Sequence, residues 1–339
     1  MADFPWPETL EQILSGDGLS RTEAHDAMAD IMAGNASESQ IAAFLVALRA
    51  KGETASEMTG FVDAMAEAAV IVEIDEPVID IVGTGGDRSN TFNISTTAAL
   101  IAAGAGVKIA KHGNRAASSK AGSADLLEAL GIDLEMTPEK TADMIRTVGF
   151  GFFYAPQYHP AMRHAGPVRR SLGLRTVFNF LGPLTNPAGA KRLAVGTSDP
   201  KMAELMIEVL KNRGAVAAFV FHGKDGLDEL TTTGPSTIYR LKQGEISLAE
   251  FTPDDFGVPR ASLDDLRGGD IDMNVAITNA VLDGETGPKR DIALVNAAAA
   301  IVVADLADGF TEGVGLAAEA VDSGDARALL DRAVEFSKP

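Results

Sequence analysis

The strongest constraint on the fold of this chain is a change of pattern near Pro77. Residues 1–75 contain three helix-capping boxes, each ahead of a segment with apolar residues at helical spacing, and the boxes begin at Ser20, Ser37 and Thr54. From Pro77 onward, short apolar runs alternate with helical segments. This alternation favours a mainly parallel sheet flanked by helices. We therefore predict an α/β protein with a small all-helical N-terminal domain and a larger sheet-containing domain.

The predicted domains are residues 1–75, all helical, and residues 76–339, α/β. The expected strands are Val78–Val82, Val107–Ala110, Leu193–Gly196 and Ala217–Phe221. The expected helices are Thr96–Ala103, Ala124–Leu130, Pro138–Val148 and Pro200–Asn212, followed by two or three closing helices from Asp291 to Phe336.

Two long stretches lack acidic residues, although the chain has 48 Asp and Glu against 29 Lys and Arg, a formal net charge of −19. Residues 88–124 and 144–198 contain no carboxylate, whereas about 13 would be expected from the average composition. Both stretches carry basic residues among many Gly, Ser, Thr and Asn residues. Basic charge beside free backbone N–H groups suits a bound phosphate. We therefore predict a small polyanion as the ligand.

Composition narrows the remaining possibilities. The chain has no cysteine, which excludes disulfides, thiol nucleophiles and thiolate metal sites. No apolar run approaches the ~18–20 residues of a membrane span, and the first residues do not read as a secretory signal. The net negative charge argues against nucleic acid and anionic membranes as partners. We expect a cytoplasmic protein that binds neither.

Three predicted loops could hold phosphate, one directly before the first acid-free stretch and two within it. The glycine-rich loop Gly83–Asp87 directly follows the first strand, where a parallel sheet binds ligands. The segment Thr91–Thr96 runs into a helix and places Ser95 or Thr96 as its capping residue. The loop Lys111–Ser119 combines two cations, an imidazole, an amide and two hydroxyls. Each loop has an ordinary structural interpretation, a turn, a cap or a solvated surface, and the binding interpretation rests on their combination.

Two later segments could bind the rest of a substrate. Aromatic residues alternate with arginines from Tyr158 to Arg170, which suits an aromatic acid, although a helix with a basic face would have the same composition. Asp228 and Glu229 follow the strand Ala217–Phe221, and adjacent carboxylates at a strand end suit Mg²⁺. The pairs Asp254–Asp255 and Asp264–Asp265 are adjacent acids as well. Only the position at the expected sheet edge favours Asp228 and Glu229.

In this order, the loops resemble those of the anthranilate phosphoribosyltransferase family. The matching strings are GTGGD, NIST, KHGNR followed by SS and GSAD, HPAM, GPVRR, NFLGPLTNP and GLDEL, and they extend nearly end to end. The resemblance implies transfer of the phosphoribosyl group from 5-phosphoribosyl 1-pyrophosphate to anthranilate, giving N-(5-phosphoribosyl)anthranilate and pyrophosphate. This is the second step of tryptophan biosynthesis from chorismate. It further implies two Mg²⁺ ions per site, a homodimer, a return of residues 167–180 to the helical domain, and an active site at the hinge.

The resemblance also implies roles for individual residues. Phosphoribosyl pyrophosphate would be bound by Gly83, Gly86, Asp87, Thr91, Asn93, Ile94, Ser95, Thr96, Lys111, His112, Gly113, Asn114, Arg115, Ala116, Ala117, Ser118, Ser119 and Ser123. Anthranilate would contact Gly83, Asn114 and Arg169, with His112, Tyr158 and His159 lining its route. Mg²⁺ would be held by Ser95, Asp228 and Glu229. No general base is assigned.

Two alternatives share the implied architecture. A pyrimidine nucleoside phosphorylase would use inorganic phosphate and would need no carboxylate pair for Mg²⁺, so Asp228, Glu229 and Arg169 argue against it. A nucleic-acid-binding relative without enzymatic activity is disfavoured by the net charge of −19. Anthranilate fluorescence would separate these possibilities, because it should decay only with both phosphoribosyl pyrophosphate and Mg²⁺ present.

Overall fold

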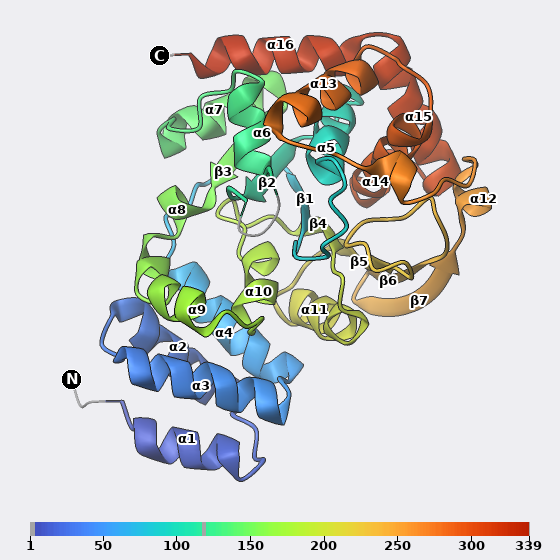
Figure 1. Ribbon diagram of the computed structural model, residues 1–339. Coiled ribbons are helices and arrows are strands. Elements are labelled where there is room, and N and C mark those ends of the chain that lie inside the picture. Colours follow the sequence, from blue (N-terminus) through green and yellow to red (C-terminus); the bar gives the residue numbers. More distant parts are fainter. Residues whose placement is uncertain (1–3, 117–119, 339) are drawn as a thin grey trace.

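The computed structural model describes residues 4–116 and 120–338. The chain begins with the helices α1 (Trp6–Leu14), α2 (Arg21–Ala33), α3 (Glu38–Lys51) and α4 (Ala55–Glu67), which lie together at one end of the molecule (Figure 1). The three predicted capping boxes are confirmed, since Ser20, Ser37 and Thr54 each exchange hydrogen bonds with the residue three positions on. Each box satisfies two N–H groups that the first helical turn leaves unpaired.

A seven-stranded sheet forms the centre of the larger domain, in the order β3-β2-β1-β4-β5-β6-β7. Its strands are β1 (Ile79–Gly83), β2 (Ile109–Gly113), β3 (Phe150–Tyr154), β4 (Arg192–Gly196), β5 (Ala217–Gly223), β6 (Ser236–Lys242) and β7 (Glu245–Phe251). The neighbours from β3 to β5 are parallel, and β6 and β7 are antiparallel additions. The predicted fold class, a helical domain plus a mainly parallel sheet flanked by helices, is confirmed.

Helices cover both faces of this sheet (Figure 1). The helices that follow α4 in the chain are α5 (Ile94–Gly104), α6 (Ser123–Ala129), α7 (Pro138–Val148), α8 (Ala155–Tyr158), α9 (Gly166–Leu172), α10 (Phe178–Leu181), α11 (Pro200–Asn212), α12 (Pro253–Phe256), α13 (Ile271–Leu282), α14 (Pro288–Val303), α15 (Phe310–Asp322) and α16 (Asp325–Ser337). Along β4, Ala194 packs with the cluster around α5 and α14, whereas Leu193 and Val195 pack with α11. This alternation is that of a strand buried on both faces. Among the described residues, no helix is both long and apolar enough to cross a membrane.

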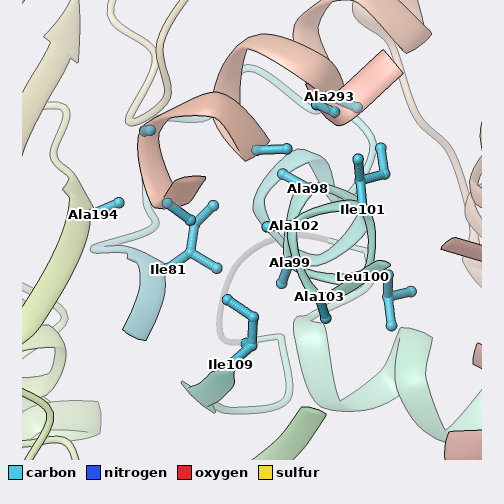
Figure 2. Close-up of a cluster of buried hydrophobic side chains, with 14 of the residues drawn as sticks. Ile81, Ala98, Ala99, Leu100, Ile101, Ala102, Ala103, Ile109, Ala194 and Ala293 are labelled. Atoms are coloured by element: carbon cyan, nitrogen blue, oxygen red, sulfur yellow. The ribbon is translucent and has the colours of Figure 1, made fainter. Parts of the chain in front are cut away.

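Small side chains let α5 lie close to the sheet and to α14. Ala98, Ala99 and Ala102 of α5 are fully buried, and Figure 2 shows them beside Ile81, Ile109 and Ala293. Burying an apolar side chain stabilises a fold by roughly 0.8 kcal/mol per CH₂ group. The close packing fixes α5 against β1 and β2, and thereby fixes the loop that leads from β1 into α5.

The segment from α9 to α10 packs against the N-terminal helices. α9 contacts α3 and α10 contacts α4. Val168 and Phe178 belong to the same buried cluster as Phe44 and Phe61 of the helical domain. The domain boundary at residues 75 and 76 stays a prediction.

The start of α5 differs from the sequence-based expectation. α5 begins at Ile94, and its capping residue is Asn93 rather than Ser95 or Thr96. The Asn93 side chain does not cap the helix, because its amide donates to the Ala121 carbonyl and its Oδ1 accepts from Asn274. Ser95 therefore lies inside the first turn of the helix, and its own N–H is free of intrahelical bonding.

Several elements were absent from the sequence-based expectation. β2 runs on to Gly113, so Lys111 and His112, predicted to lie in a loop, belong to a strand that pairs with β3. β3 itself is a new strand, and so are β6 and β7. Gln243 and Gly244 form the β6–β7 turn with φ values of 54° and 79°, a left-handed two-residue hairpin turn without the usual Asn-Gly signature. α13 is an additional helix.

Candidate active site

The predicted loops converge where the order of the parallel strands reverses. β1 lies between β2 and β4, so the chain leaves β1 toward one side and β4 toward the other. Open α/β sheets bind ligands at this kind of switch point, outside the carboxyl ends of the strands. Gly83, the last residue of β1, pairs with Gly196, the last residue of β4. The glycine-rich loop therefore opens at the position where a ligand is expected.

Asp228 lies against the ends of both strands. A Cβ added at Gly83 would be 2.4 Å from Oδ2 of Asp228, and a Cβ added at Gly196 would be 1.8 Å from the carbonyl oxygen of Asp228. Only glycine at these two positions permits such a close approach. The strand ends and the acidic loop are thus built as one unit.

The two predicted metal ligands are buried side by side. Asp228 Oδ2 accepts a hydrogen bond from the Gly85 N–H at 2.6 Å, and Glu229 Oε1 accepts one from the Ser95 N–H at 3.1 Å. Burial and then the neighbouring charge of Asp87 raise the pKa of Asp228 to about 7. Burial and then the charge of Asp228 raise the pKa of Glu229 well above its usual value. Neither carboxylate forms an ion pair within the described residues.

This donor set fits Mg²⁺ bound together with a ligand. Two buried carboxylates whose ionised forms are destabilised by burial and by a neighbouring carboxylate gain most from a divalent cation. Ser95 lies next to Glu229, as the backbone hydrogen bond shows. Within residues 4–116 and 120–338, no three His, Asp or Glu side chains converge as a ready-made metal site. The protein would therefore need oxygen atoms of a ligand to complete the coordination, as Mg²⁺ sites with phosphates do.

Lys111, a buried lysine on β2, is close enough to Asp228 and Glu229 for their charges to act on it. Lys111 is 1% exposed, and its Nζ donates to the Ile81 carbonyl of β1 at 2.6 Å. Burial lowers its pKa, while the charges of Asp80, Glu229 and Asp228 act in the opposite direction. The ammonium is therefore turned into the protein, and its predicted contact with phosphoribosyl pyrophosphate stays a prediction.

Asp80 links three parts of the site from within β1, although sequence reasoning gave it no role. Its carboxylate accepts hydrogen bonds from the His112 N–H at 3.1 Å and from the Asn186 amide at 2.7 Å. Burial raises its pKa to about 6. The available signal was a single acid inside the otherwise apolar run of residues 78–82.

His112 and His159 form a buried pair, with ring centroids 5.0 Å apart. Burial lowers the pKa of His112 to about 3, helped by the proximity of His159. Burial also lowers the pKa of His159 to about 4. Both rings are thus neutral near pH 7, and the Nε2 atom of each lacks a hydrogen-bond partner among the described residues. Tyr158, which precedes His159 in the sequence, is fully buried, and its hydroxyl donates a hydrogen bond to Thr141.

The loop after β2 is tied to α6. Asp125 accepts hydrogen bonds from the N–H groups of Ala116 and Gly122, and Ser123 donates to the Asn114 carbonyl. Arg115 forms ion pairs with Asp125 and with Glu128, and its predicted contact with phosphoribosyl pyrophosphate stays a prediction. These acids lie just beyond the acid-free stretch. The predicted residues Ala117, Ser118 and Ser119 lie outside the described residues.

The remaining predicted residues lie in the segment from β1 to α5 and at the end of β2. Gly86 and Asp87 follow β1 with Gly86 at a φ of 76°, and Asp87 accepts from the Ser89 N–H. The backbone of Thr91 forms an isolated antiparallel β-bridge with that of Arg267. Ile94 and Thr96 are buried in the first turn of α5. Gly113 is the last residue of β2.

Arg169 and its neighbour Arg170 occupy different environments on α9. Arg169 is half-buried with its guanidinium 5.3 Å from the centroid of the Phe178 ring, whereas Arg170 is exposed. Burial lowers the pKa of Arg169. No carboxylate pairs with Arg169 in the part of the chain that the structure describes. The adjacent Phe178 is buried, with 3% of its surface exposed.

Comparisons with known proteins show the family of this chain. Residues 75–327 match the Glycosyl transferase family a/b domain, and residues 7–69 match the helical bundle domain of the same family. The anthranilate phosphoribosyltransferase of Symbiobacterium thermophilum is 50% identical over 97% of this chain and 96% of its own length.

Solved structures are similarly close. The anthranilate phosphoribosyltransferase of Thermus thermophilus has a TM-score of 0.93 and 44% identity, covering 97% of this chain and 99% of the other. The Saccharomyces cerevisiae enzyme in complex with PRPP and Mg has a TM-score of 0.90 and 29% identity, covering 98% of this chain and 97% of its own. The same yeast enzyme has been solved with 4-fluoroanthranilate, at a TM-score of 0.89 and 28% identity, covering 99% and 98%. The chain therefore belongs to the anthranilate phosphoribosyltransferase family.

Proposed function

We propose that this protein transfers the phosphoribosyl group of 5-phosphoribosyl 1-pyrophosphate to the amino group of anthranilate, the second step of tryptophan biosynthesis from chorismate. The observation on which this proposal rests is the position of Asp228 and Glu229. They lie buried, without an ion-pair partner among the described residues, at the β1/β4 switch point and directly beside the glycine-rich loop. The identity of 50% with a full-length anthranilate phosphoribosyltransferase supports the same reaction. It is a glycosyltransferase reaction that releases pyrophosphate.

Mg²⁺ is the cofactor of this reaction, consistent with the yeast relative in complex with PRPP and Mg. When bound, it neutralises charge that develops on the departing pyrophosphate. Asp228 and Glu229 would hold it, with Ser95 at the adjacent helix start. We propose two ions per site. The proposal is supported by the two separate carboxylates, of which Asp228 accepts from the Gly85 N–H and Glu229 accepts from the Ser95 N–H.

The chain's own residues position the two substrates. The amine nitrogen attacks ribose C1′ as the bond to pyrophosphate breaks, so the protein must align both and stabilise the leaving charge. The glycine-rich loop and the first turn of α5 offer N–H groups to the pyrophosphate. Arg169, beside Phe178, is proposed to pair with the anthranilate carboxylate. The neutral imidazoles of His112 and His159 are proposed to line the anthranilate route, and no general base is assigned.

We further propose a homodimer located in the cytoplasm. Dimerisation is an expectation from the family, and analytical ultracentrifugation tests it directly. A sedimentation coefficient that corresponds to 35.3 kDa at all concentrations would contradict it.

A fluorescence assay tests the function itself. Purified protein is mixed with anthranilate, and its emission is followed after addition of phosphoribosyl pyrophosphate, Mg²⁺ or both. We expect decay only with both, together with release of pyrophosphate. If anthranilate stays unchanged while a pyrimidine nucleoside is cleaved with inorganic phosphate, the protein is a nucleoside phosphorylase instead.

A further inference from the structure

Arg175 connects the segment between α9 and α10 to both strands of the switch point. One guanidinium nitrogen donates to Ser198 Oγ at 3.0 Å, just after β4, and another donates to the Gly85 carbonyl at 3.2 Å, just after β1. The guanidinium also lies 5.0 Å from the centroid of the Phe180 ring. A planar fork that reaches two acceptors and stacks on a ring is a geometry that lysine does not offer.

The Gly85 peptide is held from both of its sides. Its N–H donates to Asp228 at 2.6 Å, and its carbonyl accepts from Arg175. Gly85 has a φ of 67°, and Arg88 and Asn90 have φ values of 60° and 55°. Left-handed backbone of this kind is uncommon at non-glycine residues and persists only where the surroundings impose it. Arg175 contacts the start of this loop through the Gly85 carbonyl and beside Gly86.

The charge of Arg175 has no carboxylate partner in the described residues. Its Nε is buried and lacks a hydrogen-bond partner within those residues. A Cβ added at Gly86 would lie 3.5 Å from its Cζ, so the glycine loop passes directly beside the guanidinium. A buried donor without an acceptor is costly, and the cost is offset when an anion approaches.

We propose that Arg175 is a positioning residue for phosphoribosyl pyrophosphate, which holds the Gly85 peptide against Asp228 and so sets the loop that receives the pyrophosphate. The inference rests on the proposed function. It gives Arg175 a task different from that of Arg169, although only five residues of one segment separate them. Arg169 would act on the aromatic acid, and Arg175 would act on the metal-bound pyrophosphate side.

The test compares Arg175→Ala, Arg175→Lys, Ser198→Ala and the exposed Arg170→Ala. Calorimetric titration measures the Kd of phosphoribosyl pyrophosphate with Mg²⁺, and steady-state kinetics measures KM for each substrate. For Arg175→Ala we expect Kd and KM of phosphoribosyl pyrophosphate to rise about 10- to 100-fold. The anthranilate KM should change by less than about 2-fold. The lysine variant should recover only part of the loss.

The other variants and the thermal midpoint Tm control for a purely structural role. Ser198→Ala removes one of two contacts and should weaken phosphoribosyl pyrophosphate binding by about 2- to 10-fold. Arg170→Ala should change neither constant. An unchanged Kd in Arg175→Ala overturns the proposal, and so does an equal rise of both KM values that accompanies a lower Tm. If the unaltered protein binds phosphoribosyl pyrophosphate but does not consume anthranilate, the proposed function fails while the Kd comparison still decides the role of Arg175.

Discussion

Two adjacent acid pairs of this chain look alike in sequence and behave oppositely in the structure. Asp228 and Glu229 are each 8% exposed behind the glycine-rich loop, whereas Asp264 and Asp265 lie exposed on a short 3₁₀ turn, Asp264–Leu266. Burial raises the pKa of Asp228, while hydrogen bonds from Ser262 lower the pKa of Asp265. Asp264 is also paired with Arg267. One pair is left in need of a cation, and the other is already satisfied.

The comparison shows that two adjacent acids in the sequence do not by themselves indicate a metal site. What matters is whether the fold removes water and leaves the charge uncompensated. The loop after β5 does both, because glycines at the ends of β1 and β4 let the backbone close around Asp228. At the 3₁₀ turn, Asp265 accepts hydrogen bonds from the N–H and hydroxyl of Ser262, and Asp264 pairs with Arg267.

Removing the charges of the two pairs should produce the largest difference. Asp228→Asn combined with Glu229→Gln should lower kcat/KM by about 10³-fold, because a metal ion supplies several kcal/mol of charge stabilisation. The remaining activity should need more Mg²⁺. Asp264→Asn combined with Asp265→Asn should leave kcat/KM nearly unchanged. Initial rates over a Mg²⁺ series measure both, and equal losses in the two double variants would break the comparison.

The same contrast applies to the neighbouring arginines of α9. Arg169→Ala should raise the KM for anthranilate by roughly 10- to 150-fold, since a charge-assisted contact is worth about 1.5–3 kcal/mol. The KM for phosphoribosyl pyrophosphate should move much less. Arg169→Lys should rescue only partly, because an ammonium lacks the planar fork.

Arg170→Ala is the control for Arg169, because adjacent helical residues point about 100° apart. Kinetics with each substrate varied in turn measures both variants. An anthranilate KM that stays constant in Arg169→Ala would remove Arg169 from the site.

A methyl group at Gly83 should disturb Asp228 without removing it. The added Cβ would lie 2.4 Å from Oδ2, so the carboxylate must move. We expect Gly83→Ala to lower kcat/KM by about 10- to 100-fold, as small misplacements of a reacting group do. Gly315→Ala, at an open position in α15, should keep activity and stabilise the protein by about 0.5–1 kcal/mol. Full activity of Gly83→Ala would show that the position of Asp228 is not critical.

The smallest effect concerns stability, and it should differ in sign between the pairs. The pKa of Asp228 is raised from 3.8 to about 7, so the folded state binds the proton more tightly and loses stability as pH rises through that window. Asp228→Asn should therefore raise Tm at pH 8 without metal, on the order of 1–2 °C. The difference should vanish near pH 4, where Asp228 is protonated in the folded protein.

Asp265 should respond in the opposite direction. Its pKa is lowered in the fold, so its stabilising hydrogen bonds are present above its ordinary value of 3.8 and are lost as pH falls. Asp265→Asn should thus lower Tm at pH 8. Thermal scans monitored by circular dichroism, with a chelator present, test both signs. A fall in Tm for Asp228→Asn would mean that its charge is not destabilised by burial.

Local patterns in the sequence predicted what depends on neighbouring residues. The capping boxes at Ser20, Ser37 and Thr54 and the bounds of Pro138–Val148 and Pro200–Asn212 agree with the structure. The position of Asp228 at the sheet edge could be predicted because the acids follow the strand β5 closely in the sequence.

Contacts between distant segments were not predictable in this way. Arg115 pairs with acids ten and thirteen residues later, and Arg175 reaches a loop ninety residues away. β3 was hidden because Gly149 indicated only the end of a helix, and its strand character depends on pairing with β2. The hairpin of β6 and β7 depends on a Gln-Gly turn that carries no strong signal.

The central claim is that the fold prepares Asp228 and Glu229, and not Asp264 and Asp265, for a metal. Its most direct test is a crystal structure with phosphoribosyl pyrophosphate and Mn²⁺ in place of Mg²⁺. Anomalous scattering would locate the metal unambiguously. We predict density between the pyrophosphate and the carboxylates of Asp228 and Glu229, beside Ser95, and none at Asp264 and Asp265. Metal density at the exposed pair, or bound phosphoribosyl pyrophosphate without metal at Asp228 and Glu229, would contradict this account.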